Sequence, residues 1–103
     1  MSGPLKAAFI FVAPDADPAK HRAWVETPQV HLLAVAAKNY EDSAKLAKEL
    51  AAEGIQAIEL CGGFGNLGLA KIVAAVQGKI PVGAVRFDLH PGLGGQSGDA
   101  LFG

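Results

Sequence analysis

The chain has 103 residues, of which half are apolar and 18% are charged. This composition fits a single domain, residues 1–103, with one core, and argues against a disordered chain. Nine basic and ten acidic residues give a formal charge of −1 with neither sign clustered, which argues against nucleic-acid or anionic-membrane partners. One cysteine allows no internal disulfide, and no apolar run is long enough for a signal peptide or a membrane span. We therefore expect a cytoplasmic protein.

Four short apolar runs, mostly continuous rather than alternating, predict strands that are buried on both faces of a parallel sheet: residues 5–13, 30–37, 55–61 and 81–89. Helical patterns fall between them. The first covers 17–26, with Asp17 as its expected N-cap, and the others cover 39–54 and 66–78. The glycine-rich residues 91–103 have no periodicity and predict a loop-like C-terminal extension.

The resulting order β-α-β-α-β-α-β predicts an α/β fold with a small, open, four-stranded parallel sheet and right-handed crossovers. We favour the flavodoxin-like, Rossmann-like strand order 2-1-3-4. A sequential order resembling half of a β/α barrel is the alternative. Such a small sheet leaves long edges and incomplete cover, so we expect a homo-oligomer.

The stretch "IELCGGFGNLG" at 58–68 places glycines where the third strand turns into the third helix. In the order 2-1-3-4 the ligand crevice lies between the first and third strands, at their carboxyl ends. Free N–H groups at the following helix start would suit a phosphate or carboxylate. The expected ligand-binding residues of this turn are Gly62, Gly63, Phe64, Gly65 and Asn66.

Gly63, Gly65 and Gly68 also match the spacing G-x-G-x-x-G, and Asp88 follows Gly68 by twenty positions. This imitates a dinucleotide fingerprint, but too little chain follows to hold a second nucleotide. The structural alternative is a tight turn in which Gly68 lets the helix pack closely on the sheet. We expect no cofactor.

Glu59 and Arg86 are charged residues inside predicted buried strands, where charges are costly unless paired. If the last two strands are neighbours, these side chains could form a structural ion pair. Alternatively, Arg86 binds an anion and Glu59 orients it. Alternation places Asp88 and His90 on the same face as Arg86, so Glu59, Arg86 and Asp88 join the expected ligand-binding set.

Cys61 lies at a strand end near a helix N-terminus, a setting that can activate a thiol, and His90 is its natural base partner. Lone cysteines are more often small buried hydrophobes. Asp88 and His90 could supply two metal ligands, with Glu59 or Cys61 as a third, but we expect no metal. Cys61 and His90 are the candidate catalytic residues if the chain is an enzyme, which the residues leave open.

Three segments, "AAFIFVAPDADPAKHRAWVETP", "AIELCGGFGN" and "VGAVRFDLHPGLGG", resemble a family of bacterial proteins of about this length. That family is a domain of unknown function, and CGGFG and RFD-x-HPG are its specific parts. The resemblance implies a complete bacterial protein and carries no activity, substrate, cofactor or catalytic residue.

Together these features predict a small oligomeric α/β protein that binds an anionic small molecule at the carboxyl ends of its strands. An enzyme version would be an isomerase-, lyase- or hydrolase-like activity. The alternative is a structural or regulatory assembly protein without ligand chemistry. The extension 91–103 would then be either a lid over the strand ends or an arm that reaches a neighbouring subunit.

Overall fold

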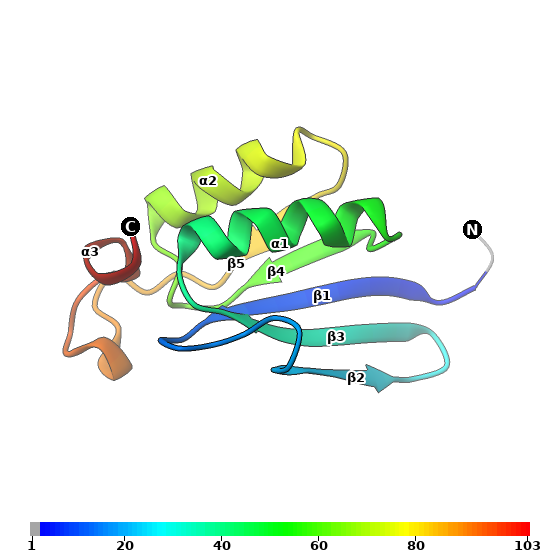
Figure 1. Ribbon diagram of the computed structural model, residues 1–103, viewed down its shortest axis with the longest axis horizontal. Coiled ribbons are helices and arrows are strands. Elements are labelled where there is room, and N and C mark those ends of the chain that lie inside the picture. The colour runs from blue at the N-terminus through cyan, green and yellow to red at the C-terminus, as the bar shows by residue number, and fades with distance from the viewer. Residues whose placement is uncertain (1–2) are drawn as a thin grey trace.

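The computed structural model describes residues 3–103 and shows an α/β fold built on one five-stranded sheet (Figure 1). The strands lie in the order β2-β3-β1-β4-β5. In chain order the elements are β1 (Leu5–Val12), β2 (Arg22–Glu26), β3 (Val30–Ala37), α1 (Tyr40–Ala52), β4 (Ala57–Leu60), α2 (Asn66–Val76), β5 (Val82–Ala84), the 3₁₀ turn η1 (Pro91–Leu93) and α3 (Gly98–Phe102).

The four predicted strands are β1, β3, β4 and β5, and they adjoin one another as β3-β1-β4-β5, all parallel. This excludes the sequential, half-barrel order. The four predicted strands do lie in the favoured order 2-1-3-4. The flavodoxin-like arrangement is still not matched exactly, because the sheet has a fifth strand and lacks the first crossover helix. The sheet is therefore mostly parallel, with one antiparallel edge strand, β2.

The helix predicted over 17–26 is wrong. Asp17 accepts a hydrogen bond from the Ala19 N–H within a local turn, and β2 follows as a strand antiparallel to β3. Trp24 and Val25 pair with consecutive residues of β3 in this register. Aromatic and β-branched residues favour a strand that has a neighbour to pair with, which outweighs the N-cap signal of Asp17.

The predictions for the last strand and the tail also need correction. The strand predicted over 81–89 is limited to Val82–Ala84. Its neighbour β4 ends at Leu60, and the chain then turns, so residues beyond 85 have no strand to pair with. Arg86 and Asp88 consequently lie in a loop. The extension 91–103 is not a loop throughout, since it contains η1 and α3.

The core fills only one side of the sheet. Helices α1 and α2 pack on the same face, where buried residues of both helices meet alternate strand residues such as Ile10, Leu33 and Leu60 (Figure 1). The predicted burial on both faces is therefore wrong. A right-handed crossover helix between β1 and β3 would have covered the other face, and β2 stands in its place.

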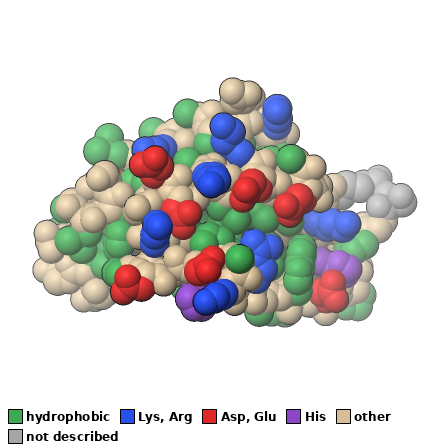
Figure 2. All heavy atoms as spheres, in the orientation of Figure 1, with side chains coloured by type: hydrophobic (Ala, Val, Ile, Leu, Met, Phe, Trp, Pro, Cys, Tyr) green, Lys and Arg blue, Asp and Glu red, His purple; other side chains and the backbone are tan. Residues whose placement is uncertain are grey.

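We call the uncovered side the open face. The strand registers place on it Leu5, Phe9, Phe11, Val25, Val30 and Leu32. None of these residues belongs to the core cluster. By contrast, positive and negative side chains are interspersed over the side that carries α1 (Figure 2). Within residues 3–103, no helix combines the length and apolar character that crossing a bilayer requires.

Candidate functional site

The glycine turn, residues 61–65, leads from β4 into α2 at the carboxyl edge of the sheet. The Cys61 N–H donates to the Ile10 carbonyl of β1, so the turn lies next to the end of β1, as the sequence predicts. Phe64 points inward, where it is buried and stacks on Tyr40 with ring centroids 5.3 Å apart. The turn is thus attached to the core by an aromatic pair.

The first N–H groups of α2 are not free, contrary to expectation. The Leu67 N–H donates to one oxygen of the Asp99 carboxylate at 2.9 Å, and the Gly68 N–H donates to the other at 3.2 Å. No side chain within α2 caps its N-terminus. Asp99 of α3 therefore acts as the N-cap of a helix that begins more than thirty residues earlier. The anion expected at this helix start is a carboxylate of the chain itself.

Tyr40, the first residue of α1, joins the turn to the tail. Its hydroxyl bonds with the Asp99 carboxylate at 2.9 Å and accepts from the Gly65 N–H at 2.9 Å. Burial, together with the neighbouring Asp99 carboxylate, raises the pKa of Tyr40 to about 12. Burial also opposes ionisation of Asp99. Even so, the Leu67 N–H, the Tyr40 hydroxyl and the Gly68 N–H together lower the pKa of Asp99 below its ordinary value.

The glycines of the turn provide space rather than unusual backbone angles. None of Gly62, Gly63, Gly65 and Gly68 has a positive φ. A Cβ on Gly65 would meet the side chains of Asp99 and Ser97, and one on Gly68 would meet the Tyr40 ring. The close packing predicted for Gly68 is therefore present, but its partner is Tyr40 of α1 and not the sheet. The tail approaches the turn at Gly65, whereas Phe87 lies against Gly62 and Val12 against Gly63.

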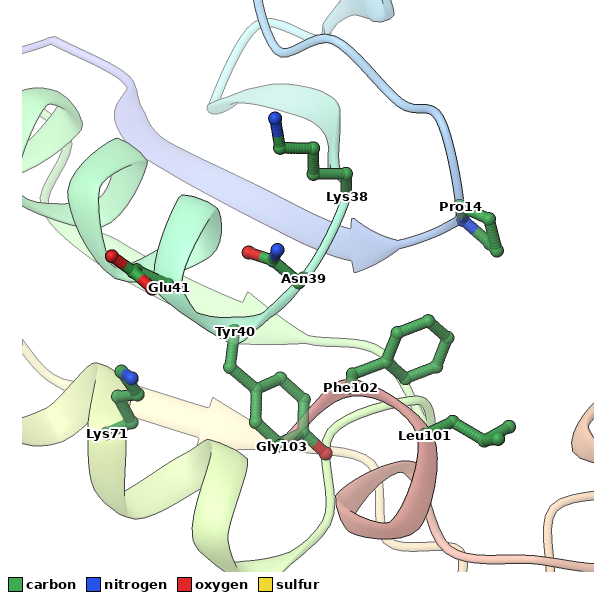
Figure 3. A pocket seen from close by; sticks show the side chains of 9 residues that line it. All are labelled: Pro14, Lys38, Asn39, Tyr40, Glu41, Lys71, Leu101, Phe102 and Gly103. Atoms are coloured by element: carbon green, nitrogen blue, oxygen red, sulfur yellow. The ribbon is translucent and has the colours of Figure 1, made fainter.

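Two clefts flank α3 at this edge. The Arg86 cleft has a volume of about 230 Å³ and is lined by Phe64, Gly65, Asn66, Leu69, Ala84, Arg86, Phe87, Asp88 and Ser97. The lysine cleft has a volume of about 470 Å³ and is lined by Pro14, Lys38, Asn39, Tyr40, Glu41, Lys71, Leu101, Phe102 and Gly103 (Figure 3). Since Ser97 lines the first and Leu101 the second, the docked tail forms a wall of each.

Arg86 is held in a defined orientation at its cleft. Its Nη1 donates to the Asn66 side-chain oxygen at 2.9 Å, and its Nη2 lies 3.0 Å from an Asp88 carboxylate oxygen. Five of the expected ligand-binding residues thus line one cleft: Phe64, Gly65, Asn66, Arg86 and Asp88. In the lysine cleft, Lys38 points away from Tyr40 and Phe102 (Figure 3).

Glu59 is not part of this site. The register pairs it with Phe9 and Gly83, which places it on the open face and exposed. The predicted ion pair between Glu59 and Arg86 is wrong, because Arg86 pairs with Asp88 instead. Arg86 lies beyond the end of β5, where strand alternation no longer applies.

Cys61 and His90 are in separate surroundings. The Cys61 sulfur accepts from the Gly63 N–H at 3.2 Å, and the thiol is partly buried. His90 caps η1 by accepting from the Gly92 N–H, and its ring packs on Phe87, whose ring lies against Gly62. No hydrogen bond between described residues joins the thiol to the imidazole. Residues 3–103 also contain no group of three or more His, Cys, Asp or Glu side chains that could hold a metal ion.

Tyr40, Ser97 and Asp99 belong to this edge of the sheet, although the sequence does not predict them there. Ser97 caps α3, since its hydroxyl accepts from the Asp99 N–H. The pattern Ser-Gly-Asp before "ALF" is a local signal for that short helix. Nothing in the sequence indicates that Asp99 also caps α2.

Residues 5–100 match a family described as a family of unknown function, DUF6506. The chain belongs to this family. The match confirms the expected resemblance to a family without an assigned function, and the DUF6506 description names no activity. No curated protein and no solved structure matches the chain.

The raised pKa of the Tyr40 hydroxyl can be measured directly, because Tyr40 is the only tyrosine of the chain. Ultraviolet titration should show tyrosinate forming with a midpoint near 12, against the ordinary 10.0. Because the folded-state pKa is the higher one, the protonated hydroxyl stabilises the fold below pH 10, and this contribution is lost as the pH rises toward 12. A midpoint near 10.0 in the folded protein would contradict the hydroxyl network.

Replacing Asp99 by Asn should lower the free energy of unfolding at neutral pH by about 1 kcal/mol, since a charged cap is lost. The pKa of Asp99 is lowered in the folded state, so its contribution is present above pH ~4 and is lost as the pH falls through the folded-state pKa. Urea unfolding at several pH values should therefore show the two proteins converging in acid. Glu49→Gln, on the exposed side of α1, is the control and should follow the wild type. A difference that persists unchanged in acid would rule out the charged cap.

Proposed function

We propose that the protein binds a small anionic molecule in the Arg86 cleft. The observation that carries the proposal is an oriented guanidinium at the mouth of a partly apolar hollow. Asn66 and Asp88 restrain Arg86, and Phe64, Leu69, Ala84 and Phe87 supply apolar surface. A restrained guanidinium loses less side-chain freedom when it binds a carboxylate or phosphate. The carboxyl edge is also where parallel sheets commonly hold ligands.

The size of the cleft limits the ligand. A volume of about 230 Å³ lies below the usual range of drug-sized pockets, roughly 300–1,000 Å³. Carboxylates or phosphates with a short apolar body fit this volume. A dinucleotide does not, and its phosphates would also have to displace Asp99 from the start of α2.

The anion would have to share Arg86 with Asp88. Both side chains of this ion pair are well exposed, at 65% and 74%. Exposed ion pairs contribute only about 0–1 kcal/mol, so exchanging Asp88 for a ligand oxygen costs little. Asp88 then acts as a competitor whose removal should strengthen binding.

Binding, rather than catalysis, is the function that these contacts support. A nucleophile needs a base within hydrogen-bond reach, and Cys61 contacts a backbone N–H instead. His90 accepts from the Gly92 N–H and is not among the residues that line the cleft.

Asp88→Asn should tighten binding several-fold, whereas Arg86→Gln should abolish it. The probes are inorganic phosphate and isobutyrate, titrated while backbone amide shifts of residues 64–66 are followed by NMR. Asp15→Asn changes the net charge equally at an exposed residue that does not line the cleft, and Arg22→Gln removes another exposed arginine. Both controls should bind like the wild type.

Saturable shifts that Asp88→Asn strengthens and Arg86→Gln removes would support the proposal. It would be overturned if neither probe gave saturable shifts. Equal strengthening by Asp15→Asn would also contradict it, since binding would then follow net charge alone.

A further inference from the structure

The open face is an apolar surface in an otherwise mixed-charge protein. Four of its large hydrophobic side chains are exposed, and those of Phe9 and Leu32 are partly exposed; the four are Leu5, Phe11, Val25 and Val30. The core cluster draws on the opposite residues of the same strands. Contiguous apolar patches of this kind mark interaction sites in soluble proteins.

Two aromatic rings stand at the middle of this surface. Phe9 and Phe11 project from the central strand β1 to the same side, and their rings stack with centroids 6.5 Å apart. Aromatic side chains are the usual anchors of protein interfaces. On this pair the ring surface faces outward with no helix over it.

Charge is nearly absent from the open face. Among the described strand residues, the registers place a single charged side chain there, Glu59. Glu59 lies on β4, between the central strand and the short edge strand β5. The apolar centre over β1 and β3 is therefore bordered by a charge on one side, as in interfaces with an apolar centre and a polar rim.

The size of the open face matches an interface between two small proteins. The five strands have eight, five, eight, four and three residues. At ~3.3 Å per residue and ~4.8 Å between strands, they cover on the order of 450 Å² in plane. Protruding side chains such as Phe11 raise the accessible area further. A standard interface takes about 800 Å² from each partner, so a dimer of standard size needs the whole open face.

A second copy of the chain is the occupant that this surface fits. A two-fold interface requires that one patch be complementary to itself. A broad sheet face with apolar side chains and one peripheral charge meets that condition, because it presents no row of like charges to its copy. A basic or acidic partner would find no matching charges over β1 and β3.

We propose that the protein forms a homodimer in which the open faces of two sheets pack against each other, about 10 Å apart. In this arrangement the partner sheet covers the side that lacks a crossover helix. The Arg86 cleft lies at the carboxyl edge and on the helix side, so the dimer is independent of the proposed ligand site.

Pairing through the edge strand β2 is the competing geometry, because an exposed edge can add a strand from another chain. The two geometries can be separated. Phe11 is 37% exposed on the open face, whereas Trp24 is 48% exposed on the opposite, helix-bearing face of β2. Each offers an apolar side chain of similar exposure for substitution by glutamate.

The test is the molar mass of the full chain by light scattering, with sedimentation to measure the dissociation constant. The wild type should have twice the protomer mass of 10.6 kDa. Phe11→Glu should raise the dissociation constant at least about 30-fold, the effect expected of a hot-spot residue. Trp24→Glu should leave the dissociation constant within a few-fold of the wild type. Circular dichroism checks that each variant folds.

Val30→Glu provides a second variant on the open face. Val30 is 38% exposed and lies on β3, outside the register that β3 shares with β2. If Phe11→Glu fails to fold, Val30→Glu decides the matter, and it too should weaken the dimer. A monomeric wild type would overturn the proposal. So would a dimer that Trp24→Glu dissociates while Phe11→Glu or Val30→Glu leaves it intact, since that pattern indicates pairing through β2.

Discussion

The Asp99 carboxylate is the contact on which the carboxyl edge of this protein depends. It satisfies two N–H groups at the start of α2 and bonds with the Tyr40 hydroxyl at the start of α1. One side chain of the tail thereby joins both helices that cover the sheet. The glycines of the turn leave the space that this contact needs, because a Cβ on Gly65 would meet Asp99 itself. The capping of α2, the glycine at position 65 and the docked position of the tail therefore all depend on the contacts of the Asp99 carboxylate.

Local signals were sufficient for the elements whose stability is mostly local. The helix predicted from residue 39 is α1, with Asn39 as its N-cap, and the helix predicted from residue 66 is α2, which begins at Asn66. The apolar runs correctly predict four strands, and the predicted strand order correctly puts the glycine turn next to the end of β1. Five of the expected site residues line one cleft for the same reason, since they follow neighbouring strand ends.

The errors arose where distant residues decide the outcome. Residues 22–26 are a strand only because β3 lies beside them, and the N-cap signal at Asp17 was the stronger local feature. A strand over 81–89 would place Arg86 beside Glu59 in the sheet, and this is why the sequence predicts Glu59 at the site. The observed β5 ends at Ala84, because β4 ends at Leu60 and offers no further residues to pair with. The sequence does not indicate the role of Asp99, because a capping residue ordinarily lies within one turn of its helix and here the separation exceeds thirty residues. Because β2 replaces the helix predicted between β1 and β3, no helix covers the open face of the sheet.

The remote cap gives α2 an unusual dependence. A helix capped by its own flanking residue keeps that cap when the rest of the protein loosens. Here the first turn of α2 loses its cap whenever α3 moves away, so the tail and this turn form one cooperative unit of local unfolding. The hydrogen-exchange rates of the Leu67 and Gly68 amides should therefore report how often the tail moves away from α2. A molecule that contacts Ser97 from the Arg86 cleft would alter those rates through the same unit.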